Sequence, residues 1–293
     1  MYRFLLIVFL MCLIICSSNI CFAKEEKTVS MSFHEVVKKL QPSVVRIFGE
    51  TNEEKIKGKT SDIVVTSGKK ILSLGTGFIV SEDGKIVTAY HVVESIIGDI
   101  YVVTYMQEKE SEHKAKVIYK DINADVAIIQ IETKNLPFVE LMGPEEVNVG
   151  EEIGFIGFPV LSGFQNFYKF PIVSKGIISA KETLSYSQGL SPVELLFINA
   201  FVNQGNSGGP LFVGRTGKVV GVVNARKLID ISERKIKLPD NYSPIMSIGG
   251  VDPIALSVQT YNMNLEYIGE VTQMGLGFCS SIESVQKFLK GLK

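Results

Sequence analysis

The chain of 293 residues has no surplus of charge of either sign. Thirty basic and 31 acidic side chains leave a net charge of −1. This balance gives no electrostatic reason to expect nucleic acid or an anionic membrane surface as a partner. Hydrophobic residues make up 46% of the chain and charged residues 21%. The composition therefore predicts a sizeable core and argues against general disorder.

Cysteine is also scarce, and its distribution is uneven. Three of the four cysteines, Cys12, Cys16 and Cys21, lie at the N-terminus, and the fourth is Cys279. If the N-terminal segment is removed, only Cys279 remains and no intramolecular disulfide can form. We expect Cys279 to be a small buried side chain in a strand. No cluster of Cys and His ligands occurs, so we expect neither a metal nor another cofactor.

The first 23 residues have the pattern of an export signal. Arg3 precedes an apolar run over Phe4–Cys16, and the small residue Ala23 comes just before a charged stretch. This pattern predicts a signal peptide cut after Ala23 and hence a periplasmic or secreted protein. The alternative is an uncleaved membrane anchor over residues 4–22, a run nearly long enough to span a bilayer.

The rest of the chain is predicted to be almost entirely β. Residues 24–42 form a charged arm followed by a helix, because Ser32 and Glu35 suit a capping box and apolar residues follow at helical spacing. Short runs rich in Val, Ile and Phe then recur between glycine turns, which indicates barrels or a sandwich. We expect strands at Ser43–Phe48, Gly77–Val80, Lys85–Ala89, Ile100–Tyr105, Lys114–Tyr119, Val126–Ile131, Glu152–Gly157, Ile172–Ser179, Val193–Ala200, Gly209–Val213, Val219–Asn224 and Gly275–Cys279, then a closing helix at Ser281–Leu289.

Two longer stretches have irregular patterns. Glu50–Leu74 is charged, with a short strand expected at Ile63–Thr66, and Arg226–Val271 contains several prolines and a Gly-Gly pair. A loop as long as the second stretch is usually a lid, a binding loop or a disordered insert. We take Leu141–Gly150 as the join between two halves of the β region.

A serine among glycines is the strongest candidate for chemistry. Ser207 lies within Asn203–Leu211, close to Gly205, Gly208 and Gly209. Glycines allow unusual backbone angles, so the N–H groups of Gly205 and Ser207 can point into one small space. This arrangement suits a nucleophile beside donors for an oxyanion. The alternative is a tight turn in which a serine happens to fall.

The three histidines give few choices for a general base. His34 is expected on the exposed face of the first helix, and His113 in a charged turn. His91 follows a predicted strand end, where barrel folds build sites, so we predict that it is the base. The alternative is a buried structural histidine.

A carboxylate should orient the histidine. Asp125 opens an apolar strand, where an unpaired carboxylate would be costly, so we predict that it faces His91. Asp121 is the nearby alternative, but it lies in the preceding turn and is expected to be solvated.

The chain order His91, Asp125, Ser207 is that of the chymotrypsin fold. With Gly-Asn-Ser-Gly-Gly-Pro-Leu at Ser207, the chain resembles trypsin-like serine proteases, especially the HtrA/Deg family, over Phe33–Val223 and Gly275–Leu289. The resemblance implies an all-β fold of two six-stranded antiparallel barrels, with a short helix at each end. The first barrel would span residues 43–147. The second would span residues 148–293, with a long insertion at 226–271.

The resemblance also implies a function. The expected activity is an exported serine endopeptidase with polypeptide substrates, in protein quality control or processing. A non-catalytic binding or chaperone-like protein on the same scaffold is the alternative. The substrate pocket would lie near residues that include no carboxylate, which favours a small or medium aliphatic side chain before the cleaved bond over Lys or Arg. These residues are Phe201, Val202, Gln204, Val223, Asn224 and Ala225.

Several features depart from the family pattern. The chain ends at Lys293, directly after the closing helix, so no PDZ domain is expected. Gln204 stands where the family commonly has proline. The basic residues Arg226 and Lys227 are compatible with an alternative specificity, for substrates with an acidic side chain before the cleaved bond. The insertion 226–271 is longer than the family's usual connection, and we hypothesise that it gates the cleft. Family members often form trimers, and the sequence leaves the oligomeric state open.

Overall fold

The computed structural model describes residues 31–52, 63–65, 71–106, 109–159, 171–184, 192–224, 236–239, 241–244, 246–247, 249–273 and 277–292. The proposed signal segment, residues 1–23, lies outside this range. Residues 31–293 form one compact unit by their internal contacts.

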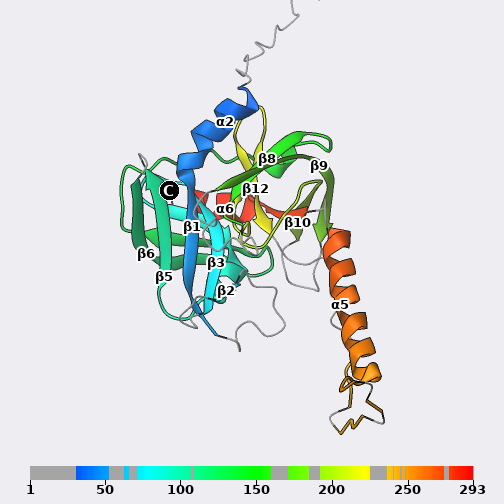
Figure 1. Cartoon of the computed structure of the whole chain (residues 1–293). Helices are drawn as coiled ribbons and strands as arrows, with labels where there is room; N and C mark the ends of the chain where they lie inside the picture. The colour runs from blue at the N-terminus through cyan, green and yellow to red at the C-terminus, as the bar shows by residue number, and fades with distance from the viewer. Residues whose placement is uncertain are drawn as a thin grey trace, which may run out of the picture. The chain divides into compact units, whose positions relative to one another are not determined.

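Six antiparallel strands close the first barrel (Figure 1). Their order is β1-β5-β6-β7-β4-β3, and pairing between β1 and β3 closes the ring, while β2 (Ile63–Val65) adds to β3. Closure leaves none of the six as a free edge along its whole length. The strands are β1 (Val44–Thr51), β3 (Ile71–Ile79), β4 (Lys85–Ala89), β5 (Ile100–Met106), β6 (Lys109–Asp121) and β7 (Val126–Ile131).

The second barrel is built in the same way, in the order β10-β13-β12-β11-β8-β9. Its strands are β8 (Glu152–Gly157), β9 (Ile172–Leu184), β10 (Val193–Ile198), β11 (Pro210–Val213), β12 (Val219–Asn224) and β13 (Gly277–Ser281). The last strand to join, β13, lies between β10 and β12 although it follows β12 by more than 50 residues. The expected fold of two six-stranded antiparallel barrels is thereby confirmed.

Buried side chains form three clusters. One fills the interior of the first barrel around Ile47 and Ile129, and another fills the second barrel around Phe155 and Leu196. The third is shared, because side chains of both barrels meet in it, among them Phe78 from the first. Burial of apolar area at this shared cluster stabilises the packing of the two barrels against each other.

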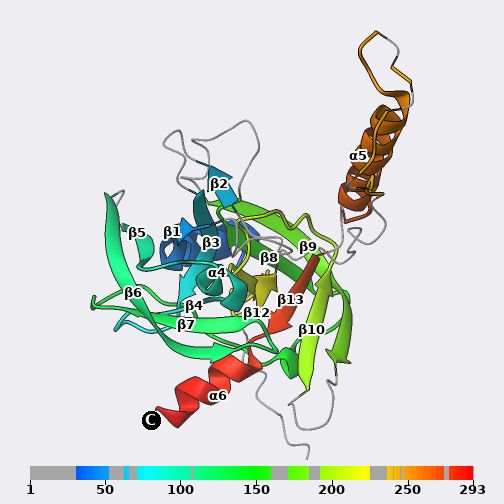
Figure 2. The ribbon, with the colours of Figure 1, turned by 90° about the horizontal axis from the view of Figure 1, so that it is seen from below.

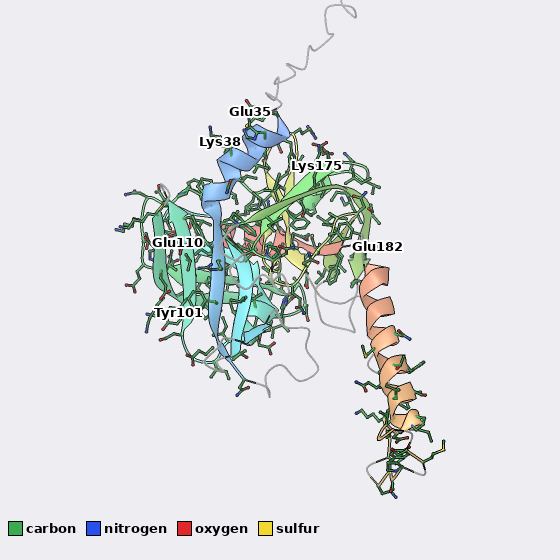
Figure 3. The ribbon with its side chains drawn as sticks, viewed as in Figure 1. Glu35, Lys38, Tyr101, Glu110, Lys175 and Glu182 are labelled. Atoms are coloured by element: carbon green, nitrogen blue, oxygen red, sulfur yellow. The ribbon has the colours of Figure 1, made fainter. Side chains whose placement is uncertain are left out.

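Short helices cover the barrels. The first, α2 (Phe33–Leu40), begins with the expected capping box of Ser32 and Glu35. Its Phe33 ring stacks on Phe212 of the second barrel at 5.8 Å between centroids, while Lys38 lies on the exposed face with Glu35 (Figure 3). The 3₁₀ turn η1 (Gln41–Ser43) then leads into β1.

The closing helix α6 (Glu283–Gly291) follows β13 (Figure 2). Its Phe288 ring stacks on Tyr119 of β6 at 4.6 Å, and Val285 is fully buried in the shared cluster. A helix that follows the second barrel thus packs on the first. The remaining short elements are α4 (Tyr90–Glu94) and the 3₁₀ turn η2 (Pro144–Glu146).

Three local expectations were wrong. Strand β3 begins at Ile71, inside the stretch 50–74 that was expected to be irregular apart from one short strand. The stretch 226–271, expected to be irregular, contains most of the helix α5 (Pro253–Gln273), which begins at a proline, a residue well suited to the first helical turn. His113 lies in strand β6 rather than in a turn, because residues 109–115 pair with β5, and this pairing outweighs the charged composition of that stretch. Within the described residues, no helix is long and apolar enough to cross a bilayer.

Candidate active site

His91 is held in place by the end of a strand. It is the second residue of α4, which directly follows β4, and Ala89 of β4 pairs with Val126 of β7. Asp125 comes immediately before β7, so strand pairing brings it opposite the start of α4. The N–H group of Tyr90 donates to the Asp125 carbonyl oxygen at 3.0 Å.

The imidazole and the carboxylate are in direct contact. His91 Nδ1 lies 2.7 Å from Asp125 Oδ2, and the His91 backbone N–H donates to Asp125 Oδ1 at 2.9 Å. Asp125 is only 4% exposed and adopts a left-handed backbone conformation, with φ of 54°. Aspartate tolerates this conformation better than most residues. The turn therefore aims both carboxylate oxygens at His91.

A third donor reaches the same carboxylate from the other barrel. Asn224, at the end of β12, donates from Nδ2 to Asp125 Oδ2 at 2.5 Å and is 4% exposed. Three donors compensate for removing the carboxylate from water. Asn224 was expected in a substrate pocket, because strand pattern alone does not tell which side chain of β12 faces Asp125.

The loop that carries Ser207 connects β10 to β11 and is attached to both barrels. The Gly208 N–H donates to the Val223 carbonyl at 2.8 Å, next to Asn224, and the Thr76 N–H of β3 donates to the Ser207 carbonyl at 2.8 Å. A Cβ added at Gly208 would lie 2.9 Å from the backbone nitrogen of Ala89. The loop thus packs on the strand end that leads into His91.

Ser207 is fully buried in this structure. Its hydroxyl is out of reach of bulk solvent, whereas the His91 side chain is 11% exposed. The two side chains therefore differ in their access to solvent.

The turn around Ser207 is built on hydrogen bonds to its carbonyl oxygens. The Asn206 N–H donates to Asn203 at 3.1 Å, and the Gly209 N–H donates to Asn206 at 2.9 Å. The Gly205 carbonyl accepts from the Thr76 hydroxyl at 2.6 Å. Gly205 and Gly208 have φ of 88° and 87°, a region open to glycine without strain. Such a turn can present backbone N–H groups to one side while its carbonyls are held on the other.

Residues 75–222, about half of the chain, match the family described as trypsin-like peptidase domain. The chain belongs to this family. It is 39% identical over 150 residues to a probable periplasmic serine endoprotease DegP-like of Pseudomonas putida (strain GB-1). It is 36% identical over 158 residues to the magnetosome formation protease MamE of Magnetospirillum gryphiswaldense. These alignments cover 51% and 54% of this chain but only 28% and 19% of those relatives.

Solved structures share the fold. The HtrA-type protease AlgW with tripeptide aligns over 89% of this chain and 64% of its own, with a TM-score of 0.55 and 22% identity. Deg5 aligns over 66% of this chain and 83% of its own, with a TM-score of 0.50 and 25% identity. The two-barrel fold of this chain is similar to the folds of both structures.

The other pocket residues expected in this trypsin-like domain lie in different surroundings. Val223 is fully buried, and its N–H and carbonyl both bond to the glycines beside Ser207, so its side chain and backbone are closed to a substrate here. Phe201 is 60% exposed, Gln204 is exposed and Val202 is half-buried. Ala225 lies outside the described residues.

The two other histidines and the alternative carboxylate lie away from this contact. His34 is exposed on α2, as expected. His113 lies between the hydroxyls of Thr104 and Thr133, at 3.1 and 3.2 Å. Asp121 accepts from the N–H groups of two following residues of its own turn. Within the part of the chain that the structure describes, no three His, Cys, Asp or Glu side chains are grouped as a metal site would need.

Proposed function

We propose that the chain is an exported serine endopeptidase in which Ser207, His91 and Asp125 form the catalytic triad. The observation that carries the proposal is the 2.7 Å contact between His91 Nδ1 and Asp125 Oδ2. It is supported by the attachment of the Ser207 loop to β12, whose Asn224 bonds the same carboxylate. Membership in the trypsin-like family and the names of the relatives point the same way.

The proposed mechanism gives each group one task. Ser207 Oγ attacks the carbonyl carbon of the peptide bond while His91 Nε2 takes its proton. The N–H groups of Gly205 and Ser207 stabilise the oxyanion that forms, an effect worth about 3–4 kcal/mol per donor. His91 returns the proton to the leaving amine. A water molecule, activated by His91 in the same way, then hydrolyses the acyl-enzyme. Asp125 keeps the Nδ1 proton in place and stabilises the imidazolium.

The proposed substrates are polypeptides with an uncharged aliphatic side chain before the cleaved bond. A Cβ added at Gly277 would overlap a methyl group of Val202, so these two residues pack together beside the turn that bears Ser207. The residues expected to form the pocket include no carboxylate, which disfavours Lys and Arg. We expect peptides with Val or Ala at this position to be cleaved faster than matched peptides with Lys or Arg. Faster cleavage after Lys or Arg would contradict this specificity.

We propose export because residues 1–23 have the pattern of a signal peptide and relatives are named periplasmic. N-terminal sequencing of the protein recovered from a cell envelope fraction tests this step. A new N-terminus at Lys24 is the expected result. An intact N-terminus in the membrane fraction would favour the anchor over residues 4–22.

Labelling with a small fluorophosphonate, together with peptide hydrolysis, tests the proposed nucleophile. Ser207→Ala should abolish both, because the attacking oxygen is removed. Ser43→Ala is the matched control, since Ser43 is also a buried serine, 2% exposed, but lies at the start of the first barrel. A wild-type protein that neither reacts nor cleaves, yet suppresses aggregation of unfolded polypeptides, would instead support a chaperone-like role.

A further inference from the structure

Thr76 of β3 lies outside the proposed triad. Its polar groups form hydrogen bonds with the Ser207 loop and with two residues beside that loop, Phe158 and Thr88. Its side chain is fully buried. The Thr76 N–H donates to the Ser207 carbonyl at 2.8 Å, and its hydroxyl donates to the Gly205 carbonyl at 2.6 Å. One residue of the first barrel thus holds two carbonyls, on either side of Asn206, in the loop from the second barrel.

The Thr76 hydroxyl is itself held by a second-barrel residue. The Phe158 N–H, just past the end of β8, donates to Thr76 Oγ1 at 2.9 Å. The hydroxyl therefore accepts from one peptide and donates to another, which orients its single proton toward Gly205. Removing a buried hydroxyl that both donates and accepts a hydrogen bond costs stability, because its two former partners are left without a bond.

A fourth bond ties Thr76 to the strand that leads to His91. The Thr88 hydroxyl of β4 donates to the Thr76 carbonyl at 2.7 Å, and Thr88 is also fully buried. Thr88 stands two residues before the start of α4, in which His91 is the second residue. Thr76 is accordingly bonded both to the strand that leads to His91 and to the loop that carries Ser207.

We propose that Thr76 is a positioning residue, which holds the Gly205–Ser207 turn so that the N–H groups of that turn are directed at the oxyanion. This inference rests on the proposed function of Ser207. Without the hydroxyl bond, the Gly205 carbonyl is released from its buried partner and the adjoining peptide planes can rotate. Catalysis is sensitive to small displacements of such donors, because they act only when aimed at the developing charge.

The chain offers well-matched variants for a test. Thr76→Val keeps the shape and the backbone N–H but removes the hydroxyl, and Thr76→Ser keeps the hydroxyl. Thr104→Val is the control, because Thr104 is a fully buried threonine of the same barrel whose hydroxyl bonds within the region of β5 and β6.

The kinetic readout is kcat and KM for a peptide substrate, measured well below the unfolding temperature of every variant. We expect Thr76→Val to lower kcat by about 10- to 100-fold with KM changed by less than about 3-fold, because the loss falls on transition-state stabilisation. Thr76→Ser should recover most of kcat, and Thr104→Val should match the wild type. Equal losses in Thr76→Val and Thr76→Ser would overturn the role of the hydroxyl.

Amide hydrogen exchange supplies a readout that does not need activity. The Gly208 and Gly209 amides donate within the loop and to Val223, so their exchange reports on its order. We expect faster exchange at these two glycines in Thr76→Val than in wild type or Thr104→Val, with amides of β13 unchanged. Unchanged loop exchange together with unchanged kcat would overturn the proposal. A wild-type protein inert to fluorophosphonate would contradict the proposed protease function, while the exchange comparison would still decide whether Thr76 holds the loop.

Discussion

At the scale of single residues, the most constrained group is the Asp125 carboxylate. It is almost completely buried, and donors from His91 and Asn224 surround its two oxygens. A buried carboxylate is stable only with such partners, since desolvation otherwise favours the neutral acid. The electrostatics of this contact should therefore respond strongly to a change at Asn224.

Replacing Asn224 by aspartate should shift the pH dependence of activity. If both carboxylates are ionised, the added negative charge beside Asp125 favours the imidazolium form of His91 in the variant. Because the base must be neutral to accept a proton, the acidic limb of the kcat/KM profile should move to higher pH. Asn224→Ala is the neutral control, expected to lower kcat without this displacement. Superimposable acidic limbs in Asn224→Asp and the wild type would show that the substitution adds no negative charge beside His91.

Cys279 is predicted to be inert in the folded protein. It is fully buried in β13, and burial raises the pKa of its thiol far above the usual range. The thiolate is the reactive form, so both low exposure and a raised pKa suppress alkylation. Iodoacetamide at pH 8 should leave the signal-free protein unmodified until denaturant is added. Rapid alkylation under native conditions would mean that β13 opens locally.

At the scale of elements, the turn bearing Ser207 depends on a glycine that no larger residue can replace. Gly208 has φ of 87°, and an added Cβ would overlap the Thr76 carbonyl and the Thr88 hydroxyl. The same backbone angle occurs at Gly98, where an added Cβ meets nothing within 4 Å. An alanine at Gly98 would therefore suffer backbone strain alone, whereas an alanine at Gly208 would suffer backbone strain and steric overlap.

Gly98→Ala should cost only the left-handed conformation, about 1–2 kcal/mol. Gly208→Ala should cost several kcal/mol, because backbone atoms of the first barrel have to shift as well. Chemical denaturation of both variants measures the difference, and fluorophosphonate labelling should be lost only in Gly208→Ala. Equal destabilisation would indicate that the turn can move away from β3 at little cost.

The N-terminal helix should respond to pH through its cap. Hydrogen bonds from Ser32 lower the pKa of Glu35 below its ordinary value of 4.5. A group with a lowered folded pKa contributes stability above its unfolded pKa, and this contribution disappears as pH falls through the folded value. Ser32→Ala should thus lower the unfolding midpoint by a few degrees at pH 7 and by less below pH 4.

Glu35→Gln is the companion variant for the cap. It keeps hydrogen-bonding capacity but removes the titrating charge, so its midpoint relative to wild type should vary with pH in the same sense. A Ser32→Ala effect that is as large at pH 3 as at pH 7 would show that the carboxylate charge does not contribute to the cap. Thermal melts followed by circular dichroism measure both variants.

At the scale of the whole described molecule, the two barrels share one buried cluster. Phe78 of the first barrel and Phe212 of the second both belong to it and are fully buried. Neither barrel can expose its part of the cluster without cost to the other. The hydrogen bonds of Thr76 and Asn224 also cross from one barrel to the other.

The barrels should therefore unfold in one cooperative transition. Phe212→Ala is expected to destabilise the protein by about 3–5 kcal/mol and to lower a single calorimetric peak. Alkylation of Cys279, in the second barrel, should follow the same transition as far-ultraviolet circular dichroism. Two separate peaks, one of them unaffected by Phe212→Ala, would mean that the first barrel is stable alone.

Much of this architecture could be read from local pattern. The strands β4, β7, β8 and β12 have the predicted bounds, because apolar runs between turns are a local signal. Helix α5 was missed because its apolar residues lack a strong helical stripe and glycines and prolines precede it. The strand around His113 was missed because its own residues, Lys109–Lys114, are charged and polar, whereas the apolar side chains that stabilise the pairing belong to β5.

The sequence by itself determined which residues carry the candidate chemistry, since a serine among glycines, a histidine after a strand and an acid before one are local features. Only the tertiary structure decided that Asn224 faces Asp125, that Thr76 holds the Ser207 turn and that Ser207 is buried. Those facts depend on which side chains meet when two closed sheets pack together. Contacts between strands more than 80 residues apart follow from barrel closure and shared burial, and no short stretch of sequence encodes them.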